Sequence, residues 1–523
     1  MGNKILKLVA YALVFGALAG TTLTSCGDKK KSNALTKIEL WYGATSTEAG
    51  PPPADWKALD IIKEKLGIEL VLAALPSNEQ DANTKINASA AANTLPDLFM
   101  VSRDTLSRLV PRGVLAPVDD LYGMMPNRTS KMYDKQSIAM TTFNGHSYGL
   151  AQPGAIIKNE GILIRKDWLE KLGLSVPVTL DDYFNVMKAF TFNDPDGNGR
   201  DDTYGFGAFL EVRPTEEGLG RRFMPFFGAY GVAGTWNLTK DAAGLNIKKP
   251  GYFDALSFVR KMQDEKVIDP NWVSYKKDDF RAAWKQGKFG IMREQNAAYG
   301  LEGGYTPFDK NFPDGEWIVI DPPVGPTGQS AVGNYSVGYR IYAVSKKAAD
   351  AGKKAKIAEL LEWMSSDEGY MLLGYGEEGV NYVIGADGIP TTDGIPDASK
   401  GYTKPEMLPL TQLRNMVFYN GDTELKSRYP TWYTSKGREM SALATLRIMQ
   451  SKAWTPTIGD DTLPTPSADL DRLYQQSVQE FITGKRELTK ENWNAWLNKF
   501  CADGGDQWEK DGIDFARSNN LLQ

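Results

Sequence analysis

Oxygen-bearing side chains recur at a regular spacing in one short segment, and this spacing is typical of a calcium loop. They fall at relative positions one, three, five and nine: Asp194, Asp196, Asn198 and Asp202. Gly199 at position six permits the sharp turn, and the carbonyl of Arg200 would supply position seven, as in an EF-hand. We therefore expect a structural calcium ion here, although Gly205 replaces the glutamate of position twelve. The alternative is a solvated Asx/Gly-rich turn.

Few residues are available for other chemistry. The chain has two cysteines, Cys26 and Cys501, and one histidine, His146. This inventory excludes a Cys/His metal site, a zinc-protease motif and a disulfide framework. No base lies near Cys501 in the sequence, so we expect a quiet, partly buried thiol. Nothing selects a pair of carboxylates for glycoside hydrolysis.

The N-terminus has the organisation of a secretory signal. Lys4 and Lys7 precede an apolar run from Leu8 to about Gly20, which is too short to span a bilayer comfortably. The ending at Cys26, preceded by Leu23, Thr24 and Ser25, looks like a bacterial lipobox. We therefore predict a signal peptide over residues 1–25 and an acylated Cys26 (a palmitate-type modification) with a polar tether over 26–36. This places the protein on the extracytoplasmic face of a cell membrane, in the periplasm or at the outer surface.

Length and charge narrow the class of protein further. A chain of 523 residues is too long for one compact core, so two or more domains are expected. The net charge of -5 argues against a nucleic-acid binder, which would carry a basic face. We expect a monomer.

Short strands alternate with helices along the chain. Strands are predicted over 37–41, 68–72 and 98–101, and a helix over 55–66 that ends at Gly67. The spacing from Thr179 to Asp182 indicates a capping box that begins a further helix. This alternation predicts α/β architecture with a mixed, mostly parallel sheet flanked by helices.

Several stretches resemble the family 1 bacterial extracellular solute-binding proteins, in particular the lipoprotein and alginate-oligosaccharide-binding branch. They extend over nearly the whole chain after the tether: residues 95–98, 109–119, 143–150, 164–179, 287–292, 361–369 and 375–382. The resemblance implies a two-lobed fold of the type II periplasmic-binding-protein kind, in which hinge strands join two α/β lobes. By analogy, lobe 1 takes residues 37–150 and 334–390, and lobe 2 takes residues 151–333 and 391–523. In alginate-binding members a carboxylate just after loop position nine completes the calcium shell, where this chain has Thr203.

A site for sugar needs aromatic plates against the C–H faces and fixed polar groups for the hydroxyls. The candidate plates at the expected cleft edges are Trp41, Tyr42, Tyr335, Trp432 and Trp454, with core packing as the alternative for each. The candidate polar contacts are Arg293, Gln295, Asn296 and Arg340. An acidic ligand would give the two arginines greater weight, because guanidinium binds carboxylate in a bidentate manner.

Three functions remain open. The resemblance implies a substrate-binding lipoprotein that captures an oligosaccharide or similar polar solute and delivers it to the permease of an ABC importer, without catalysis. The second is a secreted, lipid-anchored carbohydrate-active enzyme, either a hydrolase or a lyase. The third is a static glycan-adhesion lipoprotein, which the alternating strands and helices disfavour.

Overall fold

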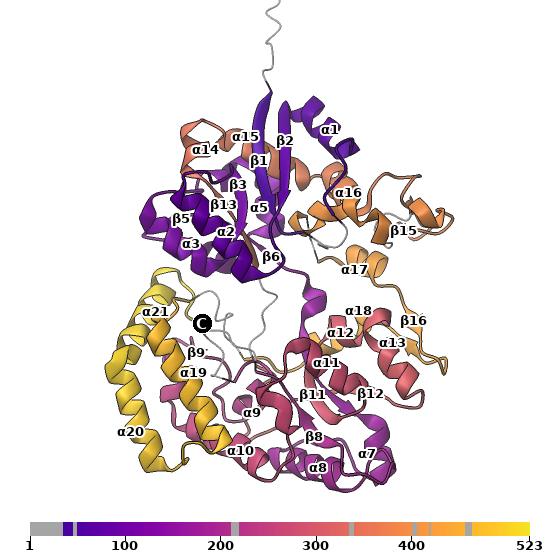
Figure 1. Ribbon diagram of the computed structural model, residues 1–523, viewed down its shortest axis with the longest axis vertical. Helices are drawn as coiled ribbons and strands as arrows, with labels where there is room; N and C mark the ends of the chain where they lie inside the picture. Colours follow the sequence, from indigo (N-terminus) through magenta and orange to yellow (C-terminus); the bar gives the residue numbers. More distant parts are fainter. Residues whose placement is uncertain are drawn as a thin grey trace, which may run out of the picture.

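The computed structural model describes residues 35–44, 50–210, 219–333, 339–399, 405–417, 420–455 and 463–523. Cys26 and Tyr335 therefore lie outside the described residues. Two lobes lie one above the other, with β1 to β3 in the upper lobe and β7, β8, β11 and β12 in the lower one (Figure 1). Within the described ranges, no helix is both long and apolar enough to cross a membrane.

The first lobe is built on a five-stranded sheet of order β2-β1-β3-β13-β6. Its strands are β1 (Thr36–Tyr42), β2 (Ile68–Ala74), β3 (Leu98–Val101), β6 (Leu150–Pro153) and β13 (Tyr339–Val344). Its helices are α1 (Lys57–Leu66), α2 (Glu79–Ala91), α3 (Arg103–Leu109), α4 (Leu121–Met124), α5 (Pro126–Met132), α6 (Lys135–Ala139), α14 (Lys346–Asp350), α15 (Lys354–Met364) and α16 (Asp367–Tyr375). Buried apolar residues cover both faces of the sheet, because alternate side chains of each strand point to opposite sides.

The second lobe is built on a four-stranded sheet of order β12-β7-β11-β8. Its strands are β7 (Glu160–Arg165), β8 (Tyr204–Gly207), β11 (Phe289–Gln295) and β12 (Trp317–Ile320). The helices around it are α7 (Lys166–Leu172), α8 (Leu180–Phe192), α9 (Met224–Gly228), α10 (Pro250–Asp264), α11 (Lys277–Lys285), α12 (Asn296–Tyr299), α13 (Glu302–Asn311) and α18 (Ala442–Gln450). Small hairpins complete the chain: β4 (Thr142–Phe143) with β5 (His146–Ser147), β9 (Trp236–Asn237) with β10 (Gly244–Leu245), β14 (Val383–Ile384) with β15 (Pro390–Thr391), and β16 (Trp432–Tyr433) with β17 (Glu439–Met440).

The C-terminal helices cover one flank of the second lobe. They are α19 (Ala468–Thr483), α20 (Lys490–Phe500) and α21 (Asp506–Ser518), drawn in yellow in Figure 1. Leu521, just after α21, belongs to the core cluster of the second lobe. Ala139 of α6 packs in the same cluster, and Lys135 donates a hydrogen bond to the carbonyl of Asn520. The end of the chain therefore joins the two lobes.

Most of the predicted elements are confirmed. Helix α1 ends at Gly67, whose φ of 62° lies in the left-handed region that glycine adopts without strain. Helix α8 begins with the expected capping box between Thr179 and Asp182. The two-lobed α/β fold is confirmed and both sheets are mixed. Antiparallel pairing has a larger share than expected: of the ladders within the two sheets as described, three are parallel and four antiparallel.

The lobes are joined by three crossings in the described part of the chain. The first follows β6 and contains the 3-10 helix η2 (Ile156–Lys158), and the second leads from β12 to β13. The third leads from η6 (Pro405–Met416) through α17 (Asp422–Arg428) to α18. Asn420 ties the third crossing to the first: its Oδ1 accepts from the Ile156 amide at 3.0 Å, and its Nδ2 donates to Gly154 at 2.9 Å.

The lobe limits remain a prediction, but the packing shows where η6 lies. Leu413, Met416 and Val417 belong to the core cluster of the first sheet. These residues follow position 390, where we expected the chain to return to the second lobe. Their apolar side chains are buried against the first lobe, so η6 packs with that lobe.

Candidate functional site

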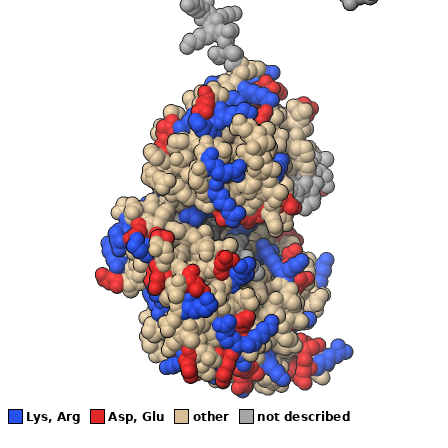
Figure 2. All heavy atoms as spheres, turned by 60° about the vertical axis from the view of Figure 1, so that its left-hand side comes forward, with Lys and Arg blue, Asp and Glu red and all other residues tan. Residues whose placement is uncertain are grey.

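The second lobe contains a pocket of about 440 Å³ on the side where β9 lies below the first lobe (Figure 1). It is lined by Gly228, Tyr230, Gly231, Val232, Ala233, Trp236, Asn237, Leu238, Thr239, Asn246, Lys249, Gly251, Thr327, Gln329, Ser330, Ala331, Trp454 and Thr455. The volume and the mixture of aromatic and amide side chains are typical of small-molecule sites. Figure 2 shows a waist between the two lobes, with basic and acidic side chains interspersed over the visible face.

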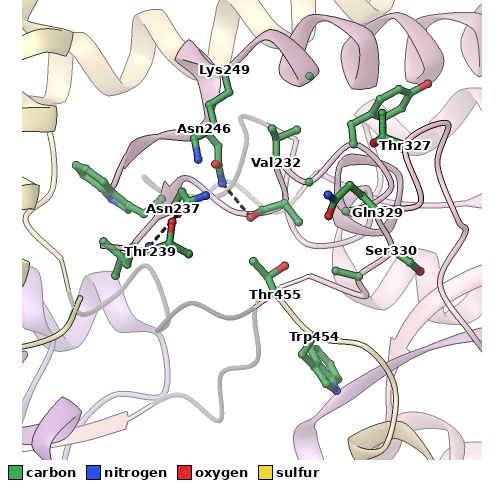
Figure 3. Close-up of a pocket in the computed structure, with 18 residues that line it drawn as sticks. Val232, Asn237, Thr239, Asn246, Lys249, Thr327, Gln329, Ser330, Trp454 and Thr455 are labelled. Atoms are coloured by element: carbon green, nitrogen blue, oxygen red, sulfur yellow. Dashed lines mark hydrogen bonds between the residues drawn. The ribbon is translucent and has the colours of Figure 1, made fainter. Parts of the chain in front are cut away.

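Four separate chain segments form the walls of this pocket. Asn246 and Lys249 lie across from Thr455 and Trp454, with Asn237 and Gln329 on two further sides (Figure 3). The C-terminal end of α9 approaches the segment around Ala331 closely. A Cβ on Gly228 would lie 2.2 Å from the Ala331 carbonyl oxygen, so only glycine fits at this position.

Two chain segments of this wall are held together by backbone hydrogen bonds. The amide of Val332 donates to Ala453 at 2.7 Å, and the amide of Thr455 donates to Gly333 at 3.0 Å. The indole Nε1 of Trp454 donates to the carbonyl of Met449 at 3.1 Å. The half-buried Trp454 ring is therefore oriented before any ligand arrives.

Three buried polar atoms of the lining residues have no hydrogen-bond partner in the described structure: Asn246 Oδ1, Trp236 Nε1 and Thr455 Oγ1. The amide nitrogen of Asn246 is by contrast fully used, since it donates to Ala233 at 3.0 Å and Gly234 at 2.8 Å. An unpaired buried polar group costs about 1–3 kcal/mol. These three atoms are covered by the surrounding protein, so a ligand hydroxyl reaches them only if the wall of the pocket moves.

Of the four predicted aromatic plates that the structure describes, one reaches the pocket. Trp454 lines it. Trp432 is buried in a different core cluster, where its Nε1 donates to Gly300 at 3.0 Å. In the first lobe, Tyr42 is buried in the core, and the half-buried ring of Trp41 carries the Lys85 ammonium 4.3 Å from its centroid.

The polar residues predicted from the end of β11 lie together, but in a buried ion-pair network and not in the pocket. Arg293 is 2% exposed and pairs with Glu160 at 3.1 Å, and Arg222 pairs with the same carboxylate at 3.2 Å. Gln295 accepts a hydrogen bond from Arg281 at 3.1 Å, and the buried Asn296 donates to the Ala442 carbonyl at 2.7 Å. These side chains hold β11 against β7 and α18.

The remaining predicted cation, Arg340, lies at the start of β13 beside the crossings. Burial lowers its pKa. Lys158 in η2 remains exposed to solvent, yet its pKa is lowered by the surrounding protein and then by the positive charges of Arg340, Lys277, Arg414 and Arg281.

Sequence reasoning missed Trp236, Asn246, Lys249 and Gln329. They come from the glycine-rich stretch after α9, from η3 (Asn246–Lys248) with its C-cap, and from the loop before β13. The one available signal is the glycine-rich run between Gly228 and Gly234, which permits close backbone packing but does not identify a binding site.

The loop from Asp194 to Asp202, where a calcium ion is predicted, is held by hydrogen bonds among its own residues. Asp194 accepts hydrogen bonds from the amides of Gly197 and Gly199, which both have positive φ. Asn198 Nδ2 lies 2.7 Å from Asp196 Oδ2 and 3.1 Å from Asp202 Oδ1, so the amide occupies the space between the two carboxylates. In the described ranges, no group of three or more His, Cys, Asp or Glu side chains is arranged to hold a metal.

Two residues limit how the calcium loop could be completed. The Thr203 hydroxyl donates to the Phe190 carbonyl at 2.8 Å and is buried away from the loop. Gly205 packs against Met187, where even a Cβ would come within 2.4 Å of the backbone, so the glutamate of position twelve cannot be accommodated. The amide of Arg200 donates to Asn198 Oδ1 at 2.8 Å.

The free thiol matches the expectation of low reactivity. Cys501 is half-buried, and burial, followed by a hydrogen bond and the charge of Asp506, raises its pKa to about 11. The thiolate needed for nucleophilic attack is therefore scarce at neutral pH.

Two mixed sheets joined by hinge crossings, with a lined pocket on the facing side of one lobe, define the class of two-lobed binding proteins. The chain belongs to the bacterial extracellular solute-binding protein family, whose sequence model matches residues 45–371. It is therefore a binding protein and not an enzyme.

Two curated relatives extend over most of the chain. The chain is 26% identical to the polygalacturonan/rhamnogalacturonan-binding protein YtcQ of Bacillus subtilis over 74% of its length and 76% of that protein. It is 27% identical to lipoprotein LipO of the same organism over 94% of its length and 96% of that protein.

Solved structures share the fold. A solute-binding protein described as binding HMO, from Bifidobacterium longum infantis, superposes with a TM-score of 0.70 at 17% identity over 94% of this chain and all of that one. An EF-hand mutant of the substrate-binding protein FusA of S. pneumoniae gives 0.64 at 18% identity, over 93% of this chain and all of that one. The alginate-binding protein AlgQ2, solved without calcium ion, gives 0.63 at 16%, over 92% of this chain and 97% of that one.

Proposed function

We propose that this protein is the substrate-binding subunit of an ABC importer, which captures an oligosaccharide between its lobes and delivers it unaltered to a membrane permease. The observation that carries the proposal is the pocket itself. Trp454 supplies an oriented aromatic plate, and the more accessible lining residues Asn237 and Gln329 supply polar side chains. The names of YtcQ as a polygalacturonan-binding protein and FusA as a fructooligosaccharide-binding protein support this ligand class.

Lobe closure follows from the hinge. A ligand held in the second lobe and touched by the first favours the closed arrangement by its contacts with both. The hydrogen bonds of Asn420 link two crossings, so they move together. Closure excludes water from the sugar hydroxyls, which strengthens their hydrogen bonds to the pocket.

We propose further that the protein is a monomer held at the extracytoplasmic face of the membrane by acyl chains on Cys26. The order of basic, apolar and small residues before this cysteine supports the anchor. The name of LipO as a lipoprotein supports it as well.

A binding screen tests the proposed function. We expect that one member of an oligosaccharide panel raises the thermal unfolding midpoint and changes tryptophan fluorescence, because Trp454 lies in the site. A ligand at 100 times its dissociation constant stabilises the folded state by about 2.7 kcal/mol. Mass spectrometry should recover that oligosaccharide unchanged. Failure of the whole panel to bind, or recovery of a cleaved product, would contradict the proposal.

We also propose that the loop from Asp194 to Asp202 binds a structural calcium ion. Rotation of the Asn198 amide by half a turn would direct its oxygen toward the space between Asp196 and Asp202, which offers the oxygen ligands that calcium prefers. The relatives described as an EF-hand mutant and as lacking calcium ion support this reading.

Calcium should raise the unfolding midpoint of the wild-type protein and not that of Asp196→Ala, because that variant loses one ligand carboxylate. Calcium at 100 times its dissociation constant should add about 2.7 kcal/mol to the free energy of unfolding. The measurement is differential scanning calorimetry after chelation, with added calcium or magnesium. The neighbouring exposed Asp201→Ala is the matched control and should respond like the wild type. Equal midpoints with and without calcium in all three proteins would rule out the site.

A further inference from the structure

The residues that the structure describes around the pocket carry a single charge. Among these described lining residues, Lys249 alone is charged and none is a carboxylate. A site for a neutral sugar has no need of a fixed, unmatched cation, because burying a charge costs free energy unless an opposite charge accompanies it. The positive charge of Lys249 therefore indicates the charge that a ligand of this pocket should carry.

Lys249 has no ion pair or side-chain hydrogen bond to any residue that the structure describes. Its neighbour Lys248 is different: its ammonium lies 2.8 Å from Asp506 and also pairs with Glu509. Lys249 is half-buried at the C-cap of η3, and burial lowers its pKa although the charge of Glu509 opposes this. Its ammonium is thus partly desolvated and is not neutralised by a contacting carboxylate.

A second group of cations lies at the crossings between the lobes. The charges with the largest effect on Lys158 are four cations, of which Arg340 and Arg414 come from the first lobe and Lys277 and Arg281 from the second. Arg281 is matched by Glu294 at 3.1 Å. This group is independent of Lys249, since it lies on η2, β13, η6 and α11 and contributes no residue to the pocket.

We propose that the ligand is an anionic oligosaccharide, one acidic group of which pairs with Lys249 in the pocket. The proposal rests on the oligosaccharide-binding function proposed above and adds the charge of the ligand. Uronic-acid carboxylates and sulfate esters share the chemistry that an ammonium recognises. The proposal rests on Lys249 and not on the cations at the crossings, which have partners of their own.

The test compares matched ligands on matched variants by calorimetric titration. The ligands are oligosaccharides prepared from polygalacturonate, alginate and chondroitin sulfate, each beside its carboxyl-reduced or desulfated counterpart, together with neutral fructo- and xylo-oligosaccharides. The protein is the wild type, Lys249→Gln and Lys240→Gln. Lys240 is exposed, follows the lining residue Thr239 and does not line the pocket, so its replacement removes the same charge without altering the wall.

We expect at least one anionic ligand to bind more tightly than its neutral counterpart. Lys249→Gln should weaken that binding about 10- to 100-fold, the range of a charge-assisted hydrogen bond, and change the neutral counterpart less than about twofold. Lys240→Gln should bind as the wild type does. Added salt should weaken the anionic ligand alone. Comparison with the carboxyl-reduced and desulfated ligands shows whether the protein recognises a carboxylate or a sulfate ester.

Two results would overturn the inference in distinguishable ways. Binding of neutral ligands alone, or equal loss of affinity for charged and neutral ligands in Lys249→Gln, would refute the anionic class and leave the binding function standing. Binding of no member of the panel would refute both. Unchanged thermal midpoints of the two variants establish that each is folded.

Discussion

Replacing Trp454 with alanine should weaken oligosaccharide binding about 30- to 800-fold, which corresponds to about 2–4 kcal/mol for a buried aromatic anchor. Among the predicted plates within the described ranges, only Trp454 lines the pocket, and its hydrogen bond to the Met449 carbonyl keeps the ring in place. Sugar C–H groups packed on this ring lose their contact surface when it is truncated. Calorimetric titration with the ligand from the binding screen measures the change.

Three variants separate this effect from a general loss of structure. Trp454→Phe retains a smaller plate and should lose less affinity than alanine. Tyr433→Ala removes an aromatic ring that is 63% exposed and lies outside the pocket, so its affinity should match the wild type. Trp432→Phe alters a different core and should affect stability more than binding. If Trp454→Ala bound the oligosaccharide as tightly as the wild type, this pocket would not be the binding site.

Replacing Glu160 with glutamine should lower the free energy of unfolding by about 3–5 kcal/mol, the typical cost of breaking a buried ion pair on one side. The Glu160 carboxylate is 5% exposed and faces both Arg222 and Arg293, so neutralising it leaves two buried guanidinium groups without their common counter-charge. Urea denaturation of the ligand-free protein measures the loss.

The control for this prediction is Glu170→Gln. This glutamate is 68% exposed and lies 3.7 Å from Lys166, so removing its charge should change the free energy of unfolding by less than about 0.5 kcal/mol. If Glu160→Gln were as stable as Glu170→Gln, the ion pairs of Glu160 with Arg222 and Arg293 would not stabilise the second lobe.

The fold could be predicted because its signals are local. The Thr179 cap, the Gly67 stop and the apolar spacing of the strands depend on neighbours within a few residues. The crossing back to the second lobe was harder to place. What holds η6 to the first lobe is the burial of Leu413 and Met416 against distant strands, which no local pattern records.

The site could be predicted only in part. The sequence places Arg293 at the end of a strand but does not show whether its side chain faces a ligand or a buried carboxylate. In the structure it pairs with Glu160, which lies 133 positions earlier in the chain. Trp454 and Trp432 are equally aromatic, yet only one lines the pocket. Lys249 carries no motif at all. Its significance depends on the surrounding side chains: the described lining residues, which come from four segments, include no carboxylate.

A crystal structure of the complex with the oligosaccharide from the binding screen would show where and in what form the ligand is held. We expect an intact sugar chain between the lobes, with one ring on Trp454, a hydroxyl at Gln329 and an acidic group at Lys249. Electron density for the sugar outside the space bounded by these three residues, or for a cleaved product within it, would show that the proposed site or the proposed function is wrong.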